Sequence, residues 1–301
     1  SYDGQFSYDE KHQMTQDLII IDEASMIDIF LAKKLFSAIK DHAQVIIVGD
    51  VDQLPSVGPG QVLKDLIDSQ MIDYTKLTTI HRQAENSSII SLAYSVNNEQ
   101  VPSDIMKTYE DRYFVPETPN DFSKRIINVI EYLHNLGYNL YEDIQVLIPM
   151  YKGNVGIDHI NKVIQEAFNP NKSKVLEHMD REFRIGDKVI QLSNQVEDNI
   201  MNGDQGTVVG ITDSGLVVDF YKNEVTYKVG DLINLKHAYA MSIHKSQGSE
   251  YKVVIMPIFR SYHIMLKKKL LYTGITRAKE KLILMGDVKS FQYGVESIEE
   301  P

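Results

Sequence analysis

The chain has 301 residues, of which 43% are hydrophobic, enough for two compact domains with cores of their own. Its net charge of −11 argues against a generally basic nucleic-acid binder, although a narrow basic groove on an acidic body is compatible with it. There is no cysteine, which excludes disulfides and thiolate metal sites. We find neither a signal peptide nor an apolar run near the roughly 20 residues of a membrane span, so we expect a cytoplasmic protein without membrane contacts.

The first third of the chain alternates apolar runs with helical patterns. We predict buried strands over 18–21 and 44–48, separated by a helix over 27–40, and a further strand over 75–79. A short helix is predicted after residue 60, and another helix is predicted over 86–97. The apolar face of the first helix consists of Ile27, Phe30, Leu31, Leu35 and Ile39. This alternation predicts a parallel sheet with helices on its faces.

A polar stretch with Pro102, Pro116 and Pro119 is the best candidate for a linker. The α/β alternation then resumes, and a tail from about Gly294 is expected to be frayed. The predicted elements are helices over 121–136, 154–168 and 264–277 and strands over 144–149, 252–258 and 281–285.

Residues 183–235 have a different character, because short strand patterns there are separated by Gly, Asn and Asp turns. The strands are expected over 187–192, 206–211, 216–220 and 225–229. This pattern predicts a small β-barrel inserted in an α/β domain. The expected domains are 1–98, 99–182, 183–235 for the barrel, and 236–301, which completes the domain that begins at residue 99.

Polar side chains follow the first two predicted strands at the point where each ends. Asp22 and Glu23 come after the first strand, and Gln53 follows the second. Carboxylates at a strand end can hold Mg²⁺ and orient an attacking water, and a neutral amide can sense a γ-phosphate. The alternative is that Asp22 only caps a helix and Gln53 is a turn residue before Pro55.

Two arginines and one polar cluster are further candidates. Arg82 precedes a predicted helix, and Arg277 lies in the run Tyr272–Ala278. The planar guanidinium fork stabilises charge on a transferring phosphoryl group, although a lone arginine is more often a surface ion-pair partner. The cluster His244–Glu250 is small and polar, which suits backbone approach to a phosphate or sugar. Its His-x₅-Glu spacing is not a zinc signature.

In their order and spacing these segments resemble superfamily 1 helicases of the RecD-like branch. The resemblance covers nearly the whole chain from residue 17 onward. It is carried by IIIDEASMID (19–28), VGDVDQLPSVGPG (48–60), LTTIHRQAENSSI (77–89), NGDQGTVVGI (202–211), AMSIHKSQGSEYKVVI (240–255) and LLYTGITRAKEKLIL (270–284). It implies two RecA-like P-loop NTPase domains, the first incomplete, with a small Src-homology-3-like barrel inserted in the second.

The resemblance also implies roles for single residues. Asp22 would hold Mg²⁺, Glu23 would be the hydrolytic base, and Gln53 would couple the γ-phosphate of ATP to the DNA track. Arg82 and Arg277 would reach the phosphates. The remaining assignments are Gly248 and Glu250 near the nucleotide, and Ser242, His244 and Lys245 at single-stranded DNA.

The implied function is ATP-dependent 5′→3′ helicase activity on single-stranded DNA and duplex junctions, with recombination or repair proteins as partners. The phosphate-binding sequence G-x-x-x-x-G-K-[ST] occurs nowhere in the chain. We therefore expect this chain to be the C-terminal motor portion of the enzyme and to be inactive alone. Two alternatives stay open at this point: a non-catalytic DNA-binding or docking module derived from such a motor, and an RNA helicase of the same superfamily.

Overall fold

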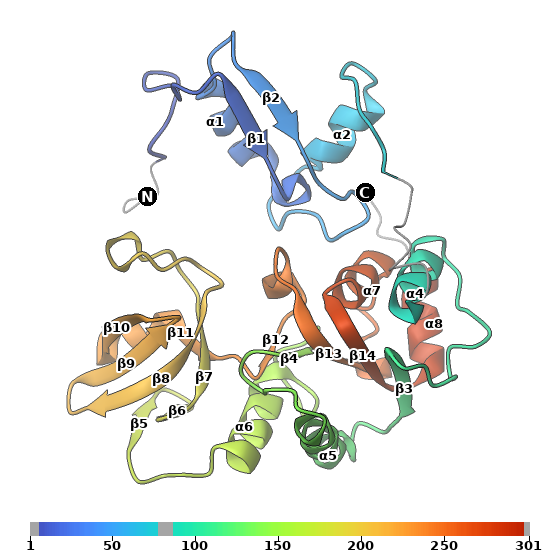
Figure 1. Cartoon of the computed structure of the whole chain (residues 1–301), viewed down its shortest axis with the longest axis vertical. Coiled ribbons are helices and arrows are strands. Elements are labelled where there is room, and N and C mark those ends of the chain that lie inside the picture. Colours follow the sequence, from blue (N-terminus) through green and yellow to red (C-terminus); the bar gives the residue numbers. More distant parts are fainter. Residues whose placement is uncertain (1–5, 78–86, 298–301) are drawn as a thin grey trace. The chain divides into compact units, whose positions relative to one another are not determined.

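The computed structural model describes residues 6–77 and 87–297, and the chain divides after Ile90 into two compact units (Figure 1). Each unit has its own sheet and its own core. None of the helices in the described ranges combines the length and the apolar character that crossing a bilayer requires.

The first unit is built on two parallel strands, β1 (Leu18–Ile21) and β2 (Gln44–Ile47), which pair in register. The single turn η1 (Ala24–Met26) and helix α1 (Ile29–Ser37) lie between them in the chain, and helix α2 (Val62–Asp68) follows β2. The carboxyl ends of β1 and β2 are therefore neighbours, as the sequence predicted.

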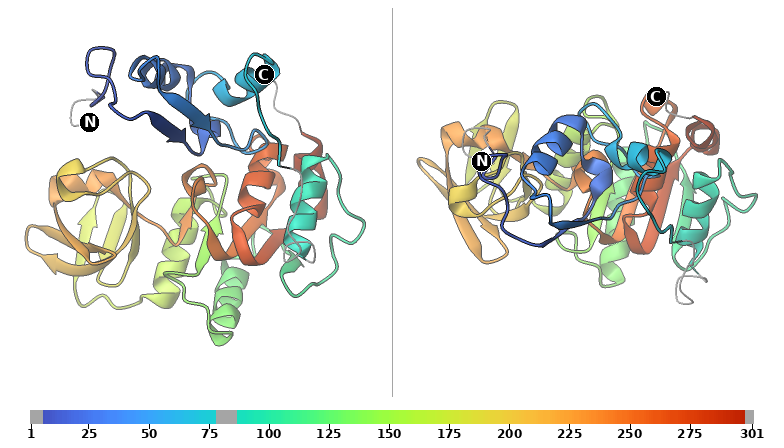
Figure 2. Two further views of the ribbon diagram at one scale, coloured as in Figure 1. Left: turned by 45° about the horizontal axis from the view of Figure 1, so that its top comes forward. Right: turned by 90° about the horizontal axis from the view of Figure 1, so that it is seen from above.

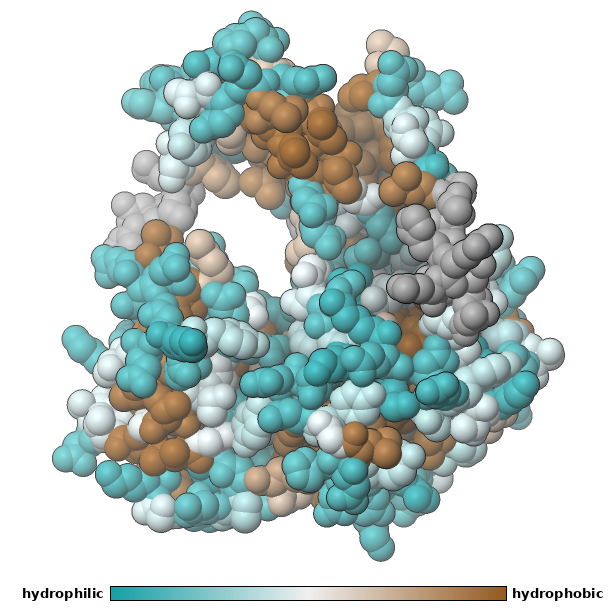
Figure 3. Space-filling model, viewed as in Figure 1, coloured by the Kyte–Doolittle hydropathy of each residue, from teal (hydrophilic) through white to brown (hydrophobic). Residues whose placement is uncertain are grey.

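Only one face of this two-stranded sheet is buried. Ile19, Ile21 and Ile47 pack with Leu63 of α2, whereas Ile20 on the opposite face is 63% exposed. Three more side chains share this exposed face: Leu18, Ile46 and Val48. Figure 3 shows hydrophobic surface gathered over this unit. The prediction of two fully buried strands is wrong, because the described residues of the unit cover the sheet on one side only.

Helix α1 is shorter than predicted. The side chain of Asp28 accepts a hydrogen bond from the backbone N–H of Leu31 at 2.7 Å, and this cap sets the start of the helix. Leu35 packs against the core, but Phe30, which we predicted on the same buried face, is 68% exposed. The predicted strand over 75–79 does not form at residues 75–77, and its last two residues lie outside the described ranges.

The second unit contains a five-stranded parallel sheet in the order β12-β4-β13-β14-β3. Helix α6 packs against β12, and α7 and α8 pack against β13. The strands are β3 (Arg112–Pro116), β4 (Ile144–Leu147), β12 (Ala240–Met241), β13 (Tyr251–Ile258) and β14 (Ala278–Gly286). The helices are α4 (Ser88–Asn97), α5 (Phe122–Asn135), α6 (Ile157–Phe168), α7 (Lys268–Ile275) and α8 (Val288–Glu296).

Two segments that we took for irregular structure are ordered elements of this unit. Strand β3, inside the expected linker, forms the edge of the sheet, where a terminal Pro116 is tolerated because an edge position needs no further N–H donor. The first residues of the expected frayed tail are the end of α8, which Asp287 caps and which buries Gly294 and Val295, and the rest of that tail, residues 298–301, lies outside the described residues. The sequence around α8 has too few apolar residues at helical spacing for the helix to be predicted.

The barrel is an antiparallel five-stranded sheet in the order β10-β9-β8-β7-β11, with a core of its own that includes Phe183, Val218 and Tyr227. Figure 2 shows it beside the β12 end of the parallel sheet in both views. The strands are β7 (Lys188–Gln191), β8 (Gln205–Thr212), β9 (Gly215–Phe220), β10 (Asn223–Lys228) and β11 (Leu235–His237). A hairpin, β5 (Val175–His178) and β6 (Arg181–Arg184), precedes it.

Candidate functional site

The first group of candidate residues follows β1. Asp22 is exposed, and its Oδ1 accepts a hydrogen bond from the backbone N–H of Glu23 at 2.8 Å. Glu23 itself has a left-handed backbone, with φ 52° and ψ 38°. This conformation costs a non-glycine residue about 1–3 kcal/mol, and such strain is concentrated at functional sites. The two carboxylates thus stand at the end of the strand.

The end of β2 lies directly beside this pair. The backbone N–H of Ala24 donates to the carbonyl of Val48 at 2.9 Å. Gly49 follows, and a Cβ there would lie only 3.0 Å from the nitrogen of Ala24 and 2.7 Å from a methyl carbon of Leu63. Glycine is therefore required for the two strand ends to approach this closely.

The two ends of the Gln53 side-chain amide differ in their hydrogen bonding. Its Nε2 donates to Oδ2 of Asp50 at 3.3 Å, which fixes the amide. Its Oε1 is buried and has no hydrogen-bond partner within residues 6–77 and 87–297. A buried unpaired acceptor is costly in a native protein unless a ligand or water supplies the donor.

The protein side chains at this site could supply only some of the ligands of a magnesium ion. Within the described ranges, no three His, Asp or Glu side chains gather closely enough to hold a metal ion. Mg²⁺ in nucleotide sites is bound by one or two carboxylates together with phosphate oxygens and waters. Asp22 and Glu23 match that requirement, with the phosphates supplying the other ligands.

The second group lies in the second unit, before β13 and β14. The guanidinium of Arg277 is buried and donates to the carbonyl of Ser249 at 3.1 Å and to that of Thr273 at 3.2 Å. A third bond joins its Nη2 to the hydroxyl of Thr276 at 3.3 Å. These bonds hold the side chain against the turn that contains Gly248, whose φ is +75°. Arg277 and this turn, 28 residues apart in sequence, are thus brought together.

Glu250 is engaged away from that turn. Its Oε2 lies 2.6 Å from Nζ of Lys279, and both side chains are more than half exposed. An exposed ion pair of this kind contributes at most about 1 kcal/mol, so Glu250 can give up Lys279 for another partner.

The third group is the turn after β12. Ser242 is buried, and its carbonyl accepts from the backbone N–H of Lys245 at 3.1 Å, which closes a short helical turn over His244–Ser246. Nζ of Lys245 then donates to Oδ1 of Asn202 in the barrel at 2.5 Å. Burial, together with the charge of Lys236, lowers the pKa of Lys245.

The patch around Lys245 includes residues that the sequence did not single out. Nζ of Lys236 lies 4.8 Å from the ring centre of Tyr151, which is 40% exposed. Two lysines, an amide and an aromatic ring therefore gather beside the barrel, a combination suited to phosphates and stacked bases. Asn202 lies in the NGDQG run, which was noted, whereas Lys236 and Tyr151 lie in no recognisable motif. Arg82 lies outside the described residues.

Three family models match the chain. An AAA domain matches residues 4–120, the SH3 domain of ATP-dependent RecD-like DNA helicases matches 160–220, and a UvrD-like helicase C-terminal domain matches 237–285. Together they match parts of both units and the larger part of the barrel.

Relatives and solved structures agree with these models. The ATP-dependent RecD2 DNA helicase of Deinococcus radiodurans is 33% identical over 95% of this chain and 39% of its own length. The RecBCD enzyme subunit RecD of Buchnera aphidicola is 26% identical over 94% of this chain and 56% of its own. The chain thus spans about half, or less, of these relatives.

The structural neighbours include Pif1 helicases. One, from a structure of two Pif1 helicases at forked double-stranded DNA, aligns with a TM-score of 0.57 and 18% identity over 95% of this chain and 72% of its own. Pif1 from Candida albicans aligns with a TM-score of 0.55 and 17% identity over 92% of this chain and 73% of its own. The fold is that of two RecA-like domains with an SH3-like barrel, and this chain belongs to the RecD-like superfamily 1 helicases.

Proposed function

We propose that this chain is the C-terminal motor portion of an ATP-dependent helicase that moves 5′→3′ along single-stranded DNA. Its limited share of its relatives' length supports the idea of a portion, and the RecD-like barrel supports the direction. The proposed parts are a first motor domain over 1–98, a second over 99–182 and 236–301, and the inserted barrel over 183–235.

The observation that carries the proposal is the arrangement at the ends of β1 and β2. Asp22 is exposed and Glu23 half-buried after β1, and Gln53 follows β2 with a buried Oε1 that has no hydrogen-bond partner among the described residues. In the proposed reaction Asp22 would hold Mg²⁺, Glu23 would take the proton of the attacking water, and Gln53 would accept a hydrogen bond that depends on the γ-phosphate. When bound, Mg²⁺ would supply positive charge that offsets the phosphates.

Arg277 suits the stabilisation of charge on the phosphates, and Gly248 is proposed beside the nucleotide. Three of the five N–H groups of the arginine are used in holding it in place. No described residue accepts from the remaining two, which suit a bidentate partner such as a phosphoryl group. Glu250 would join the nucleotide side of the site by exchanging its exposed partner, and Arg82 is proposed for the same phosphates from sequence alone.

The single strand is proposed to lie over Ser242, His244 and Lys245. Lys245 beside Asn202, and Lys236 over Tyr151, give this acidic chain a local basic patch with an aromatic ring. Duplex junctions, and recombination or repair proteins, are the proposed further partners. The same motor parts would serve an RNA helicase, and the patch alone would serve a non-catalytic DNA-binding module.

The test uses Glu23→Gln in a longer protein of the kind proposed, in which this chain is joined to a phosphate loop. We expect binding of ATP and Mg²⁺ to persist while phosphate release nearly stops, because the amide cannot take a proton. Glu10→Gln makes the same chemical change at an exposed position of the first unit and is the matched control. Normal turnover by the Glu23 variant would show that Glu23 is structural and not the catalytic base, whereas absence of ATP hydrolysis by the unsubstituted protein would assign the chain to the non-catalytic alternative. Unwinding of duplexes with a 5′ or a 3′ single-stranded tail, of DNA and of RNA, decides direction and substrate.

A further inference from the structure

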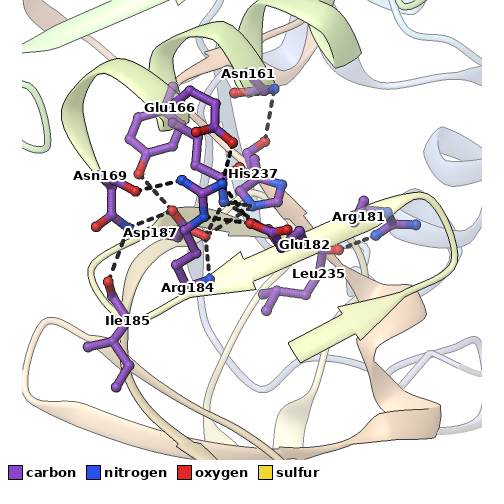
Figure 4. Close-up of polar contacts among 12 residues, drawn as sticks. Asn161, Glu166, Asn169, Arg181, Glu182, Arg184, Ile185, Asp187, Leu235 and His237 are labelled. Carbon is purple, nitrogen blue, oxygen red and sulfur yellow. Dashed lines mark hydrogen bonds and ion pairs between the residues drawn. The ribbon is translucent and has the colours of Figure 1, made fainter. Parts of the chain in front are cut away.

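The chain enters the barrel from the α/β part of the second unit and later returns to it. The two connecting segments meet at Asp187. The entry is the turn from Arg184 to Asp187, and the exit runs from His237 to Tyr239. Figure 4 shows side chains from the barrel root and from α6 converging on this carboxylate. The carboxylate is fully buried, at 0% exposure.

Five donors surround the two oxygens of Asp187. Oδ2 accepts from Nε2 of Gln165 and the backbone N–H of Arg184, both at 2.7 Å, and from Nε2 of His237 at 3.2 Å. Oδ1 accepts from Nδ2 of Asn169 at 2.9 Å and the hydroxyl of Tyr239 at 3.0 Å. Burial raises the pKa of this carboxyl, but these donors outweigh that effect and lower the pKa overall, so it is charged at neutral pH.

The motor side of this contact is a row of amides on α6. Asn161 and Gln165 on the helix and Asn169 at its C-terminal cap are spaced four residues apart and share one face. Gln165 and Asn169 hold Asp187. Asn161 holds β12, because it accepts from the backbone N–H of Ala240 at 2.8 Å and donates to the carbonyl of Ala240 at 2.9 Å.

Arg184 adds a second attachment of the barrel root to α6. Its guanidinium is buried and donates to the backbone carbonyl of Asn169 at 2.8 Å. It also binds Glu166 of α6 and Oε1 of Glu182, the latter at 2.6 Å. Two apolar surfaces in contact can slide past each other. Buried directional hydrogen bonds to charged groups, such as those between the barrel root and α6, are satisfied in one orientation only.

We propose that Asp187 and the amide row of α6 form a polar joint that fixes the orientation of the barrel relative to the Ser242–Lys245 turn. Asp187 is thus a positioning residue. The same helix that holds the barrel root also holds β12, and β12 leads directly into that turn. The joint therefore aligns Asn202 of the barrel with Lys245 of the motor fold. Its effect on DNA binding rests on the function proposed above, whereas the rigid orientation does not.

The orientation can be measured directly in the 301-residue chain, because the chain has no cysteine. Spin labels at Asp213→Cys in the barrel and Glu131→Cys on α5 occupy two exposed positions across the joint. Pulsed electron paramagnetic resonance gives the distribution of the distance between them. We expect a narrow distribution in the otherwise unsubstituted chain and a broad one with Asp187→Asn, which offers an amide N–H₂ to a ring of donors.

The control is Asp287→Asn. Asp287 caps α8 in the same unit, and its contacts are to Lys289 and Ser290, not to the barrel. This variant should lose some thermal stability but keep the narrow distribution. Tyr239→Phe removes a single donor from Asp187 and keeps the ring, so it provides a milder test if Asp187→Asn does not fold.

Binding of a fluorescein-labelled oligodeoxythymidine at low salt supplies the second readout. We expect Asp187→Asn to weaken binding about five- to thirtyfold, which corresponds to about 1–2 kcal/mol, although it replaces no residue on the DNA patch. An unchanged distance distribution in both joint variants overturns the joint, whatever the DNA result. A broad distribution with unchanged DNA affinity overturns the positioning role. Failure of the unsubstituted chain to bind DNA at all overturns the proposed function and the positioning role with it, while the distances still decide the joint.

Discussion

Lys188 provides the sharpest test of the energetics at the barrel root. Its side chain is 2% exposed, and its Nζ donates to the carbonyls of Leu140 and Ile144 at 3.3 and 3.2 Å and to Oε1 of Gln145 at 3.2 Å. Burial lowers the pKa of this amine from 10.5 to about 7, although the charge of Asp143 acts in the opposite direction. The folded protein therefore binds this proton less tightly than the unfolded chain does.

The sign of the pH dependence follows from that difference. Between pH 7 and pH 10.5 the unfolded chain carries more of this proton than the folded protein, so the free energy of unfolding rises with pH in this window. The slope approaches about 1.4 kcal/mol per pH unit, and the expected gain between pH 7 and pH 9 is about 2 kcal/mol. Lys188→Met keeps the length of the side chain and removes the titrating group, so this part of the rise should vanish.

The measurement is urea unfolding of the chain and of the K188M variant at half-unit steps from pH 6.5 to pH 9. The difference between the two free energies of unfolding isolates Lys188, since every other titrating group is common to both. Two curves that run parallel through this range would refute the argument and show that the buried amine keeps its ordinary affinity for a proton.

Three further outcomes are expected for the complete protein and for the chain. In the complete protein, Arg277→Ala should lower ATP hydrolysis about 10³-fold, as removal of an arginine finger does, with nucleotide-free DNA binding little changed; Arg277→Lys should recover only part, because the fork is lost. Arg82→Ala should behave in the same way in a phosphate-release assay, and a loss mainly of DNA affinity would move that arginine to the DNA. For the chain, Lys245→Gln should reduce the slope of log affinity for single-stranded DNA against log salt by about one. Lys222→Gln, in the turn between β9 and β10 and outside the proposed DNA patch, should leave this slope unchanged.

Local pattern was sufficient to predict that the ends of two strands in the first unit, where the candidate site residues follow, lie next to each other. Asp22, Glu23 and Gln53 follow two apolar runs, and the carboxyl ends of parallel neighbouring strands meet at one edge of a sheet. The barrel was also predictable, because turn residues recur between short strands over 183–235. What the pattern did not reveal was the exposed face of β1 and β2, since an apolar run looks the same whether one face or two are covered.

The contacts that organise the second unit were decided only by tertiary packing. Arg277 meets Ser249 across 28 residues, and Asp187 meets Gln165 across 22 and His237 across 50. The amides of α6 do recur at helical spacing, but sequence alone gives no reason to read them as ligands of a buried carboxylate. Periodicity reports which side of an element faces the core, whereas the partner found there depends on how distant segments are brought together, and that is set by the packed chain as a whole.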